Sequence, residues 1–402
     1  MTNHSVSSAA APARPGTAAR RILDVDALRG FALFGILVVN IAFFATAYPW
    51  HGVDDPAFSS GVDDAVRWFV ALAFEMKFYL LFSFLFGYSF TLQMDSAARA
   101  GASFRARMLR RLATLFVLGA AHAVLFFHGD ILTTYAVLGL VLLAMRRVGP
   151  RTAMITAVVL TVVVAAFIAL ASLGGLGPST DTAAALAGGQ RSTAALEGSP
   201  ATVIAEHLRS MPQMLSALAS VQAPAALAAF LVGLAAGKRR VLAEAHRHRR
   251  ALRTVQLVGY PVGLAGAAVF ASTGGTTGLN MVAVALTVVT GPLLAAAYVA
   301  TLLRFFGTPT GHRVAGALAP AGRMALTNYL AQSVVCAVIF TGWGFGLIGD
   351  VSPPAAVGIA VAVFAAQAVF SARWLAGHRY GPVEWVLRAA TNARRPQWRR
   401  TA

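Results

Sequence analysis

Charged residues are scarce in this chain of 402 residues, at 12% of the total, whereas hydrophobic residues make up 57%. The mean hydropathy is +0.68, and apolar stretches of about 17 to 25 residues recur along nearly the whole length. A soluble core cannot account for such long apolar runs. The composition therefore excludes a soluble protein and predicts an all-α fold, a polytopic bundle of transmembrane helices.

Cysteine is almost absent, and acidic residues are few. The one cysteine, Cys336, lies inside an apolar run, so no intrachain disulfide and no cysteine-based metal site can form. We predict no metal and no bound cofactor. The 15 acidic residues face 33 basic ones, which gives a formal charge of +18. In a soluble protein that charge would indicate a nucleic-acid partner, but its distribution fits a membrane topology better, and we expect no nucleic acid.

About ten apolar segments are long enough to span a membrane. They lie near residues 27–49, 65–93, 112–128, 131–146, 152–174, 213–237, 254–272, 280–304, 323–349 and 355–375. The connections between them are alternately basic and not basic. Only Arg67, Arg191 and Arg209 fall on or beside the predicted outer side and Lys77 falls within a span, which leaves 29 of the 33 basic residues on the other side. Basic loops stay in the cytoplasm, so both termini are predicted to be cytoplasmic.

The predicted organisation is a single transmembrane domain, residues 23–392, with a basic cytoplasmic tail at 393–402. Residues 1–22 are predicted to be a disordered cytoplasmic leader, because the apolar segment after them lacks a small-residue cleavage site. The longest outer segment, 175–212, is rich in Gly, Ala, Ser and Thr and ends in a short amphipathic helix. We expect a flexible loop there rather than a cover over a site.

The C-terminal stretch YGPVEWVLR is typical of an amphipathic helix at the membrane surface. Pro382 suits the first turn of such a helix. Glu384 and Arg388 are spaced to form an i, i+4 ion pair. We interpret this helix as an anchor to the membrane surface.

The stretch HAVLFFHGDILTTY places His122 near the outer end of one predicted span and Asp130 in the turn after it. Imidazole is the usual general base near neutral pH, and a carboxylate can orient it for acyl transfer to a hydroxyl or amine. The alternatives are structural. His122 could be a neutral histidine that hydrogen-bonds a neighbouring helix, and Asp130 suits the N-cap of the next helix, with Thr133 at its third position.

Other polar residues also fall within predicted spans, where an ionisable group costs about 3 kcal/mol. Glu75 and Lys77 lie in the second span, too close in sequence to share a helix face, so each needs its own partner or an aqueous pocket. Asn40 reaches the outer half of the first span. These three residues are candidates for substrate binding.

A second polar group opens the ninth span in GRMALTNYLAQS. Asn328 and Gln332 share one helix face, and Arg323 stands at the cytoplasmic start of the span. They are predicted to line an inner-facing cavity. Hydrogen bonds between helices are the alternative.

Five segments in order resemble the YeiB-like family of bacterial inner-membrane proteins: LDVDALRGFALFGILVVN, KFYLLFSFLFGYSF, RRLATLFVLGAAHAVLFFHGDILTTYAVLG, GRMALTNYLAQS and GPVEWVLR. The resemblance implies a multi-pass protein of the bacterial plasma membrane. The chain is also distantly similar to transmembrane acyltransferases such as heparan-alpha-glucosaminide N-acetyltransferase, whose opening pattern is echoed by Asp26, Arg29, Gly30 and Asn40. The catalytic histidine of that enzyme follows its first span, where this chain has only His51, so the base here is His122 or His51.

The expectation from this resemblance is transfer of an acyl group from cytosolic acyl-CoA, as co-substrate, to a small-molecule, glycan or lipid acceptor. Arg29 and Arg323 would attract the anionic donor. His122 would deprotonate the acceptor, Asp130 would orient His122, and Asn40 or Lys77 would stabilise the oxyanion. The rival interpretation is a secondary transporter that uses Glu75, Lys77, His122 and Asp130 as an ion or proton relay. A non-catalytic scaffold that binds membrane lipids is a third. The sequence does not define the oligomeric state.

Overall fold

The structure, a computed structural model, describes residues 15–174, 181–245, 247–278 and 280–400, and every regular element in these ranges is helical. The α-helices are α1 (Pro15–Ala45), α2 (Gly61–Ala73), α3 (Phe78–Arg99), α4 (Phe104–Leu125), α5 (Leu132–Ala144), α6 (Pro150–Leu173), α7 (Thr182–Glu197), α8 (Pro200–Ala217), α9 (Ala223–Lys238), α10 (Arg249–Ser272), α11 (Met281–Phe305), α12 (Pro309–Arg323), α13 (Ala325–Phe340), α14 (Pro353–Gly377) and α15 (Pro382–Asn392). Three short helical turns are η1 (Tyr48–His51), η2 (Met145–Arg147) and η3 (Leu218–Gln222). The predicted all-α fold is confirmed.

The number of membrane spans is slightly lower than predicted. In the described part of the chain, eight helical segments are long and apolar enough to cross a membrane, and the bent pair α12 and α13 makes a ninth. The missing span is 131–146. Its helix, α5, has 13 residues, so it is about 20 Å long at 1.5 Å per residue, whereas the hydrocarbon core is about 30 Å thick. The chain is therefore an integral membrane protein with eight or nine candidate spans.

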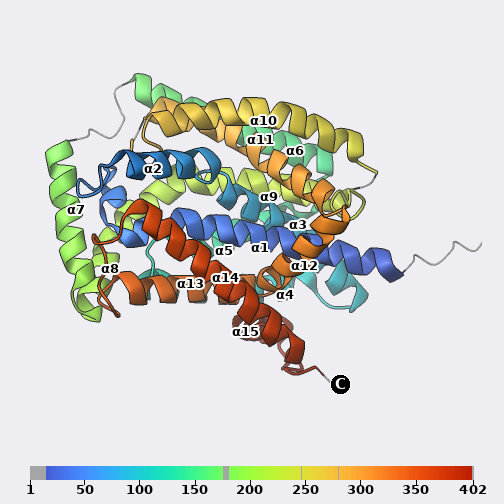
Figure 1. The fold of residues 1–402 in the computed structure, drawn as a ribbon. Helices are drawn as coiled ribbons and strands as arrows, with labels where there is room; N and C mark the ends of the chain where they lie inside the picture. The colour runs from blue at the N-terminus through green and yellow to red at the C-terminus, as the bar shows by residue number, and fades with distance from the viewer. Residues whose placement is uncertain (1–14, 175–180, 246, 279, 401–402) are drawn as a thin grey trace, which may run out of the picture.

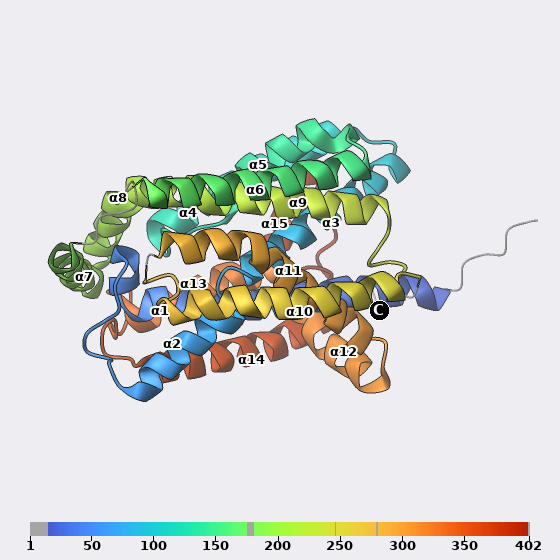
Figure 2. The same ribbon diagram turned by 90° about the horizontal axis from the view of Figure 1, so that it is seen from above.

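Most helices run along one common direction, so the bundle has two ends (Figures 1 and 2). The start of α1 and the helix α15 lie at one end, which we call the inner end. The helices α7 and α8 lie at the opposite end, the outer end (Figure 1). The basic connections after α3, α5, α9 and α11 lie at the inner end. This arrangement puts both termini of the described chain at one end, and its assignment to the cytoplasm remains a prediction.

Helix α1 packs closely on its neighbours through residues that lack a side chain. A Cβ at Gly322 of α12 would lie 1.8 Å from the carbonyl oxygen of Asp26, and one at Gly30 would lie 2.4 Å from that of Leu318. Small residues allow helices in a membrane to approach this closely, because association there relies on van der Waals packing. Gly30 of the first motif is thus needed for the contact of α1 with α12.

Two spans are broken. Residues 74–77 separate α2 from α3, and Met76 there has φ +62°, which is unfavourable for a residue with a side chain. Helices α12 and α13 meet at 75°. Glu75 and Lys77 were expected within a continuous span and instead lie in the first break, where Lys77 Nζ donates to the carbonyl oxygen of Ala71 at 2.7 Å. A break frees backbone groups that side chains can then satisfy.

The outer segment was predicted to be a flexible loop that ends in a short amphipathic helix. The helix is confirmed as part of α8, but the loop prediction is wrong over the described residues. Residues 175–180 lie outside the described chain, but α7 and α8 form a hairpin over the outer end (Figure 1). Gly188 packs on the ring of His51 and Gly189 on the ring of Tyr48. The glycines that suggested a flexible loop are contact points instead. At the other terminus, residues 1–14 of the predicted leader lie outside the described chain, and α1 already begins at Pro15.

The tail helix α15 begins at Pro382 as predicted, but its predicted ion pair is not formed. Glu384 instead accepts hydrogen bonds from the backbone N–H groups of Leu326 and Thr327, at 2.7 and 3.0 Å. It thereby caps the N-terminus of α13, which is a more favourable place for a carboxylate than an exposed ion pair. Arg388 lies over the ring of Tyr380, 4.4 Å from its centre.

Candidate functional site

His122 and Asp130 form a buried pair. His122 belongs to the last turn of α4, and the tight turn after α4 brings Asp130 back beside it. The Nδ1 atom of His122 lies 2.9 Å from one carboxylate oxygen of Asp130, and the side chains are 2% and 1% exposed. The second oxygen accepts from the backbone N–H of Thr133 at 2.8 Å. Asp130 therefore caps α5 and orients His122 at the same time.

The other nitrogen of His122 has no hydrogen-bond partner among the described residues, although it is fully buried. The ring of Tyr329, from α13, lies 5.2 Å from the imidazole ring. The Tyr329 hydroxyl is also buried; it lies near the backbone of Ile131 but completes no hydrogen bond of ordinary geometry among the described residues. Two orphaned polar groups so close together are unusual, because buried polar groups are nearly always hydrogen-bonded. An oriented imidazole with a free nitrogen is the arrangement that a general base requires.

Aromatic rings close the outer side of His122. The Phe127 ring lies 6.4 Å from the imidazole ring and stacks on Phe44 of α1 at 4.6 Å. Both phenylalanines line a cavity of about 10 Å³ together with Trp50 and His128. Such a space holds about one water molecule. A substrate can reach His122 from this side only if the rings move.

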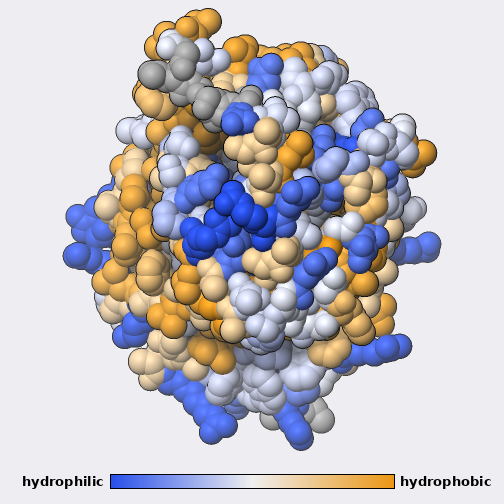
Figure 3. Space-filling view, turned by 90° about the vertical axis from the view of Figure 1, so that its left-hand side faces the viewer, coloured by the Kyte–Doolittle hydropathy of each residue, from blue (hydrophilic) through white to orange (hydrophobic). Residues whose placement is uncertain are grey.

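The main cavity lies at the outer end and has a volume of about 560 Å³. Its walls come from the outer half of α1, the segment 46–58, α2, the turn before α11 and the start of α14. Apolar residues such as Val38, Ile41, Val66, Val70 and Val357 make up most of the lining. Hydrophilic residues gather near the middle of the outer face, with apolar residues at its sides (Figure 3). The cavity thus has an apolar body and a polar rim.

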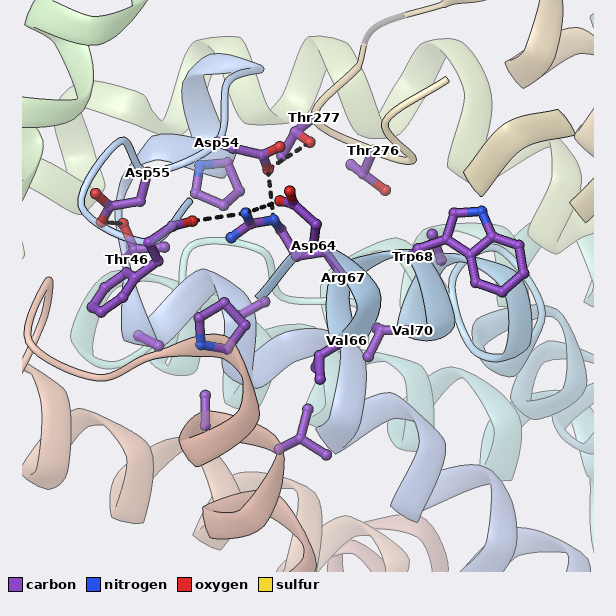
Figure 4. Close-up of a pocket in the computed structure, with 18 of the residues that line it drawn as sticks. Thr46, Asp54, Asp55, Asp64, Val66, Arg67, Trp68, Val70, Thr276 and Thr277 are labelled. Atoms are coloured by element: carbon purple, nitrogen blue, oxygen red, sulfur yellow. Dashed lines mark hydrogen bonds and ion pairs between the residues drawn. The ribbon is translucent and has the colours of Figure 1, made fainter. Parts of the chain in front are cut away.

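The polar rim is acidic. Arg67 is held by Asp64 at 2.6 Å and by the carbonyl oxygen of Phe58 at 2.7 Å, with Asp54 at 3.8 Å (Figure 4). Asp55 accepts from the hydroxyl of Thr46 at 2.7 Å (Figure 4). With Glu75, the cavity has four carboxylates and one arginine in its lining. This excess of negative charge suits a ligand that carries hydroxyl or amino groups.

Of the predicted substrate-binding residues, only Glu75 lines the main cavity. It accepts hydrogen bonds from the backbone and hydroxyl of Thr276, at 3.0 and 2.7 Å. Lys77 is fully buried, 5.9 Å from the centre of the Phe270 ring. Asn40 is half-buried on α1 and does not line the cavity.

Arg29 and Arg323 come together at the inner end. Arg29 forms an ion pair with Asp26 at 2.6 Å and donates to the hydroxyl of Ser89 at 2.6 Å. Arg323 is exposed at the bend between α12 and α13, and its charge also acts on Asp26. This inner group lies far along the bundle from the cavity at the outer end.

Asn328 and Gln332 lie buried between α13 and α14. Asn328 donates to the hydroxyl of Ser371 at 2.9 Å, and Gln332 donates to the side-chain oxygen of Gln367 at 2.9 Å. These contacts join the two helices, as the alternative interpretation expected.

His51 belongs to a different group, which holds the outer hairpin in place. Its Nε2 lies 2.9 Å from the hydroxyl of Ser192, and that hydroxyl donates to Glu206 at 2.6 Å. Glu206 is also paired with Arg209 at 2.6 Å. Burial lowers the pKa of His51, although the charge of Glu206 opposes the shift. The contacts of His51 thus hold the outer hairpin in place, so His122 is the stronger candidate for the general base.

Sequence reasoning missed Tyr329 and the lining residues Asp55 and Arg67. Tyr329 lies in a quoted motif, but a tyrosine inside an apolar run gives no signal of a polar neighbour. Asp55 gives no such signal either, because acidic residues contribute little to membrane topology. Among the described residues, no group of three potential ligands is arranged to hold a metal ion.

Comparison with known proteins finds relatives along the whole chain. A family model described as "Protein of unknown function (DUF418)" matches residues 236–394. The uncharacterized protein YxaH of Bacillus subtilis (strain 168) is 33% identical, over 94% of this chain and 96% of its own. An uncharacterized 39.9 kDa protein of Bacillus acidopullulyticus is 28% identical over 93% and 95%. The uncharacterized protein YeiB of Escherichia coli (strain K12) is 27% identical over 92% and 96%. No solved structure matches.

Proposed function

The chain belongs to the YeiB-like, DUF418 family of membrane proteins, and we propose that it is a transmembrane acyltransferase with His122 as its general base. The observation that carries this proposal is the free Nε2 of a buried histidine whose other nitrogen is held by a carboxylate. The pairing fixes the orientation of the ring and stabilises the imidazolium that forms during proton transfer.

The chemistry is the following. The Nε2 atom of His122 takes the proton from an acceptor hydroxyl or amine, and the acceptor oxygen or nitrogen attacks the carbonyl carbon of the acyl-CoA thioester. The carbon–sulfur bond breaks, and the imidazolium returns its proton to the leaving CoA thiolate. The Tyr329 hydroxyl, which completes no hydrogen bond of ordinary geometry among the described residues, is available to donate to the oxyanion.

The main cavity suits the acceptor. Its apolar body accommodates a lipid chain or an apolar face, and its acidic rim can accept hydrogen bonds from the hydroxyl or amino groups of a glycan or a lipid-linked sugar. The inner arginines, Arg29 and Arg323, suit the phosphate-rich end of acyl-CoA. The inner end is then cytoplasmic and the membrane is the bacterial plasma membrane, in keeping with the basic loops.

Helix α1 separates the cavity from His122. Ile41, Ala42 and Ala45 line the cavity, whereas Phe44 is rotated by roughly 120° on the helix and stacks on Phe127 beside His122. The acceptor must therefore pass the Phe44–Phe127 pair before it reaches the base. Separation of these two rings is the conformational step that the proposal requires.

The test is turnover of acyl-CoA by the purified chain in nanodiscs. Release of free CoA is measured with and without pooled envelope glycans and lipids. The proposal expects release that depends on the acceptor. Release of no CoA from any acyl donor would contradict acyl transfer.

A secondary transporter is the second candidate, because two spans are broken. Broken helices at membrane depth are typical of transporters, and the 75° bend and the fully buried Lys77 fit that pattern. Flux of solute driven by an imposed proton gradient in proteoliposomes, with no consumption of acyl-CoA, would favour this function over the first.

A further inference from the structure

Arg111 forms no ion pair within the described part of the chain. It lies on α4, half-buried at the inner end, and its Nε atom is shielded from solvent without a hydrogen-bond partner in the described chain. A guanidinium that is partly removed from water and has no anionic partner is costly.

The neighbouring charges do not neutralise Arg111. The groups that act on it most are Arg388 and Arg29, which are also positive, and then Glu384. Both carboxylate oxygens of Glu384 are already used, since they accept from Leu326 and Thr327 at the start of α13. Asp26 is paired with Arg29. Positive charge is thus concentrated at the inner end. The nearby acidic groups, Glu384 and Asp26, already bind other partners.

We propose that Arg111, assisted by Arg29 and Arg388, binds a phosphate group of a ligand at the inner end. The planar guanidinium presents paired donors that match phosphate oxygens, and a charged acceptor forms the strongest hydrogen bonds with it. A phosphate supplies the negative charge that the protein lacks there. The phosphate can belong to the headgroup of an anionic lipid or to a soluble molecule. The site does not depend on acyl transfer and stands whichever reaction the chain performs.

The test compares two probes on the full chain in an uncharged detergent. Pyrophosphate represents a soluble phosphate, and phosphatidylglycerol represents a lipid headgroup, with KCl of equal ionic strength and neutral diacylglycerol as the controls. The readout is the rise in Tm. At least one probe should raise the Tm of the natural protein and of Arg105→Gln, an exposed control on the same helix, and the rise should be largely lost in Arg111→Gln.

The probe that acts identifies the source of the phosphate. A rise of the same size in Arg111→Gln, or no rise beyond the controls with either probe, would overturn the proposal. If Arg111→Gln does not fold, Arg388→Gln replaces it, because Arg388 is exposed. Loss of its charge should raise the half-maximal probe concentration about tenfold, and an unchanged concentration would count against the site.

Discussion

Substitution of Tyr329 can separate a chemical role of its buried hydroxyl from a structural one. Removal of the Tyr329 hydroxyl costs little stability, because it completes no hydrogen bond of ordinary geometry among the described residues. We therefore expect Tyr329→Phe to keep the Tm of the natural protein within a few degrees while kcat for acyl transfer falls by roughly 100- to 1000-fold, the range for loss of one oxyanion donor. Tyr79→Phe, at another tyrosine whose buried hydroxyl completes no hydrogen bond among the described residues, is the control. An undiminished kcat would remove Tyr329 from the mechanism.

His128 makes the outer end sensitive to acid. It lies in the turn between α4 and α5, where burial, and then the neighbouring His207, lowers its pKa to about 3. In the unfolded chain its pKa is near 6.5. Because the folded state holds the neutral form, the stability is complete above about pH 6.5 and is lost as the pH falls toward 3, by up to about 1.4 kcal/mol per pH unit.

The measurement for His128 is the Tm between pH 7 and pH 4.5 for the natural protein and for His128→Gln. The natural protein should lose stability more steeply, since glutamine does not titrate. His51, whose pKa is also lowered by burial, contributes the same sign in both proteins and therefore cancels in the comparison. Equal slopes would show that folding leaves the pKa of His128 unchanged.

At the scale of elements, the contact between α13 and α15 rests on Glu384. Loss of a helix cap costs about 1 kcal/mol, with a range of roughly 0.5–2, and Glu384 also satisfies the hydroxyl of Thr327. Glu384→Ala should therefore lower the Tm clearly. Arg388→Ala should lower it less, since Arg388 only covers the Tyr380 ring. Equal losses in the two variants would instead indicate the ion pair that the sequence suggested.

The sequence predicted the long helices well, but it predicted the ends of short helices and the contacts of the outer hairpin poorly. Apolar length alone locates α1, α6, α10, α11 and α14, because a span needs about 20 apolar residues. It overestimates α5, because the last residues of the predicted span 131–146 form the separate turn η2. It also cannot show that the glycines of α7 are packing points, since their partners His51 and Tyr48 are distant in sequence.

The same limit applies to the candidate site. The pairing of His122 with Asp130 could be anticipated, because a tight turn separates them and one residue orients the other. The cavity could not, since its walls come from five segments spread between residues 38 and 357. The neighbour Tyr329 arrives from α13, and only the fold brings it to His122.

At the scale of the whole molecule, the orientation in the membrane is open to direct measurement. Cys336 is fully buried, so after its replacement by serine, single cysteines can report which side a residue faces. Ser59→Cys, at the outer end, should react with a membrane-impermeant maleimide in intact cells. Ser103→Cys, in the turn between α3 and α4, should react only after the membrane is opened. The reverse pattern would place the basic loops outside and contradict the predicted topology.

The central claim is that His122 is the base of an acyl transfer. The most direct measurement is acceptor-dependent release of CoA by His122→Ala in nanodiscs, beside His207→Ala, a second buried histidine near the outer end whose Nδ1 lies 3.0 Å from the carbonyl oxygen of Val124. Both variants are first shown to be folded by their Tm. The account predicts that release is abolished in His122→Ala and persists in His207→Ala. A folded His122→Ala protein with full release would contradict it.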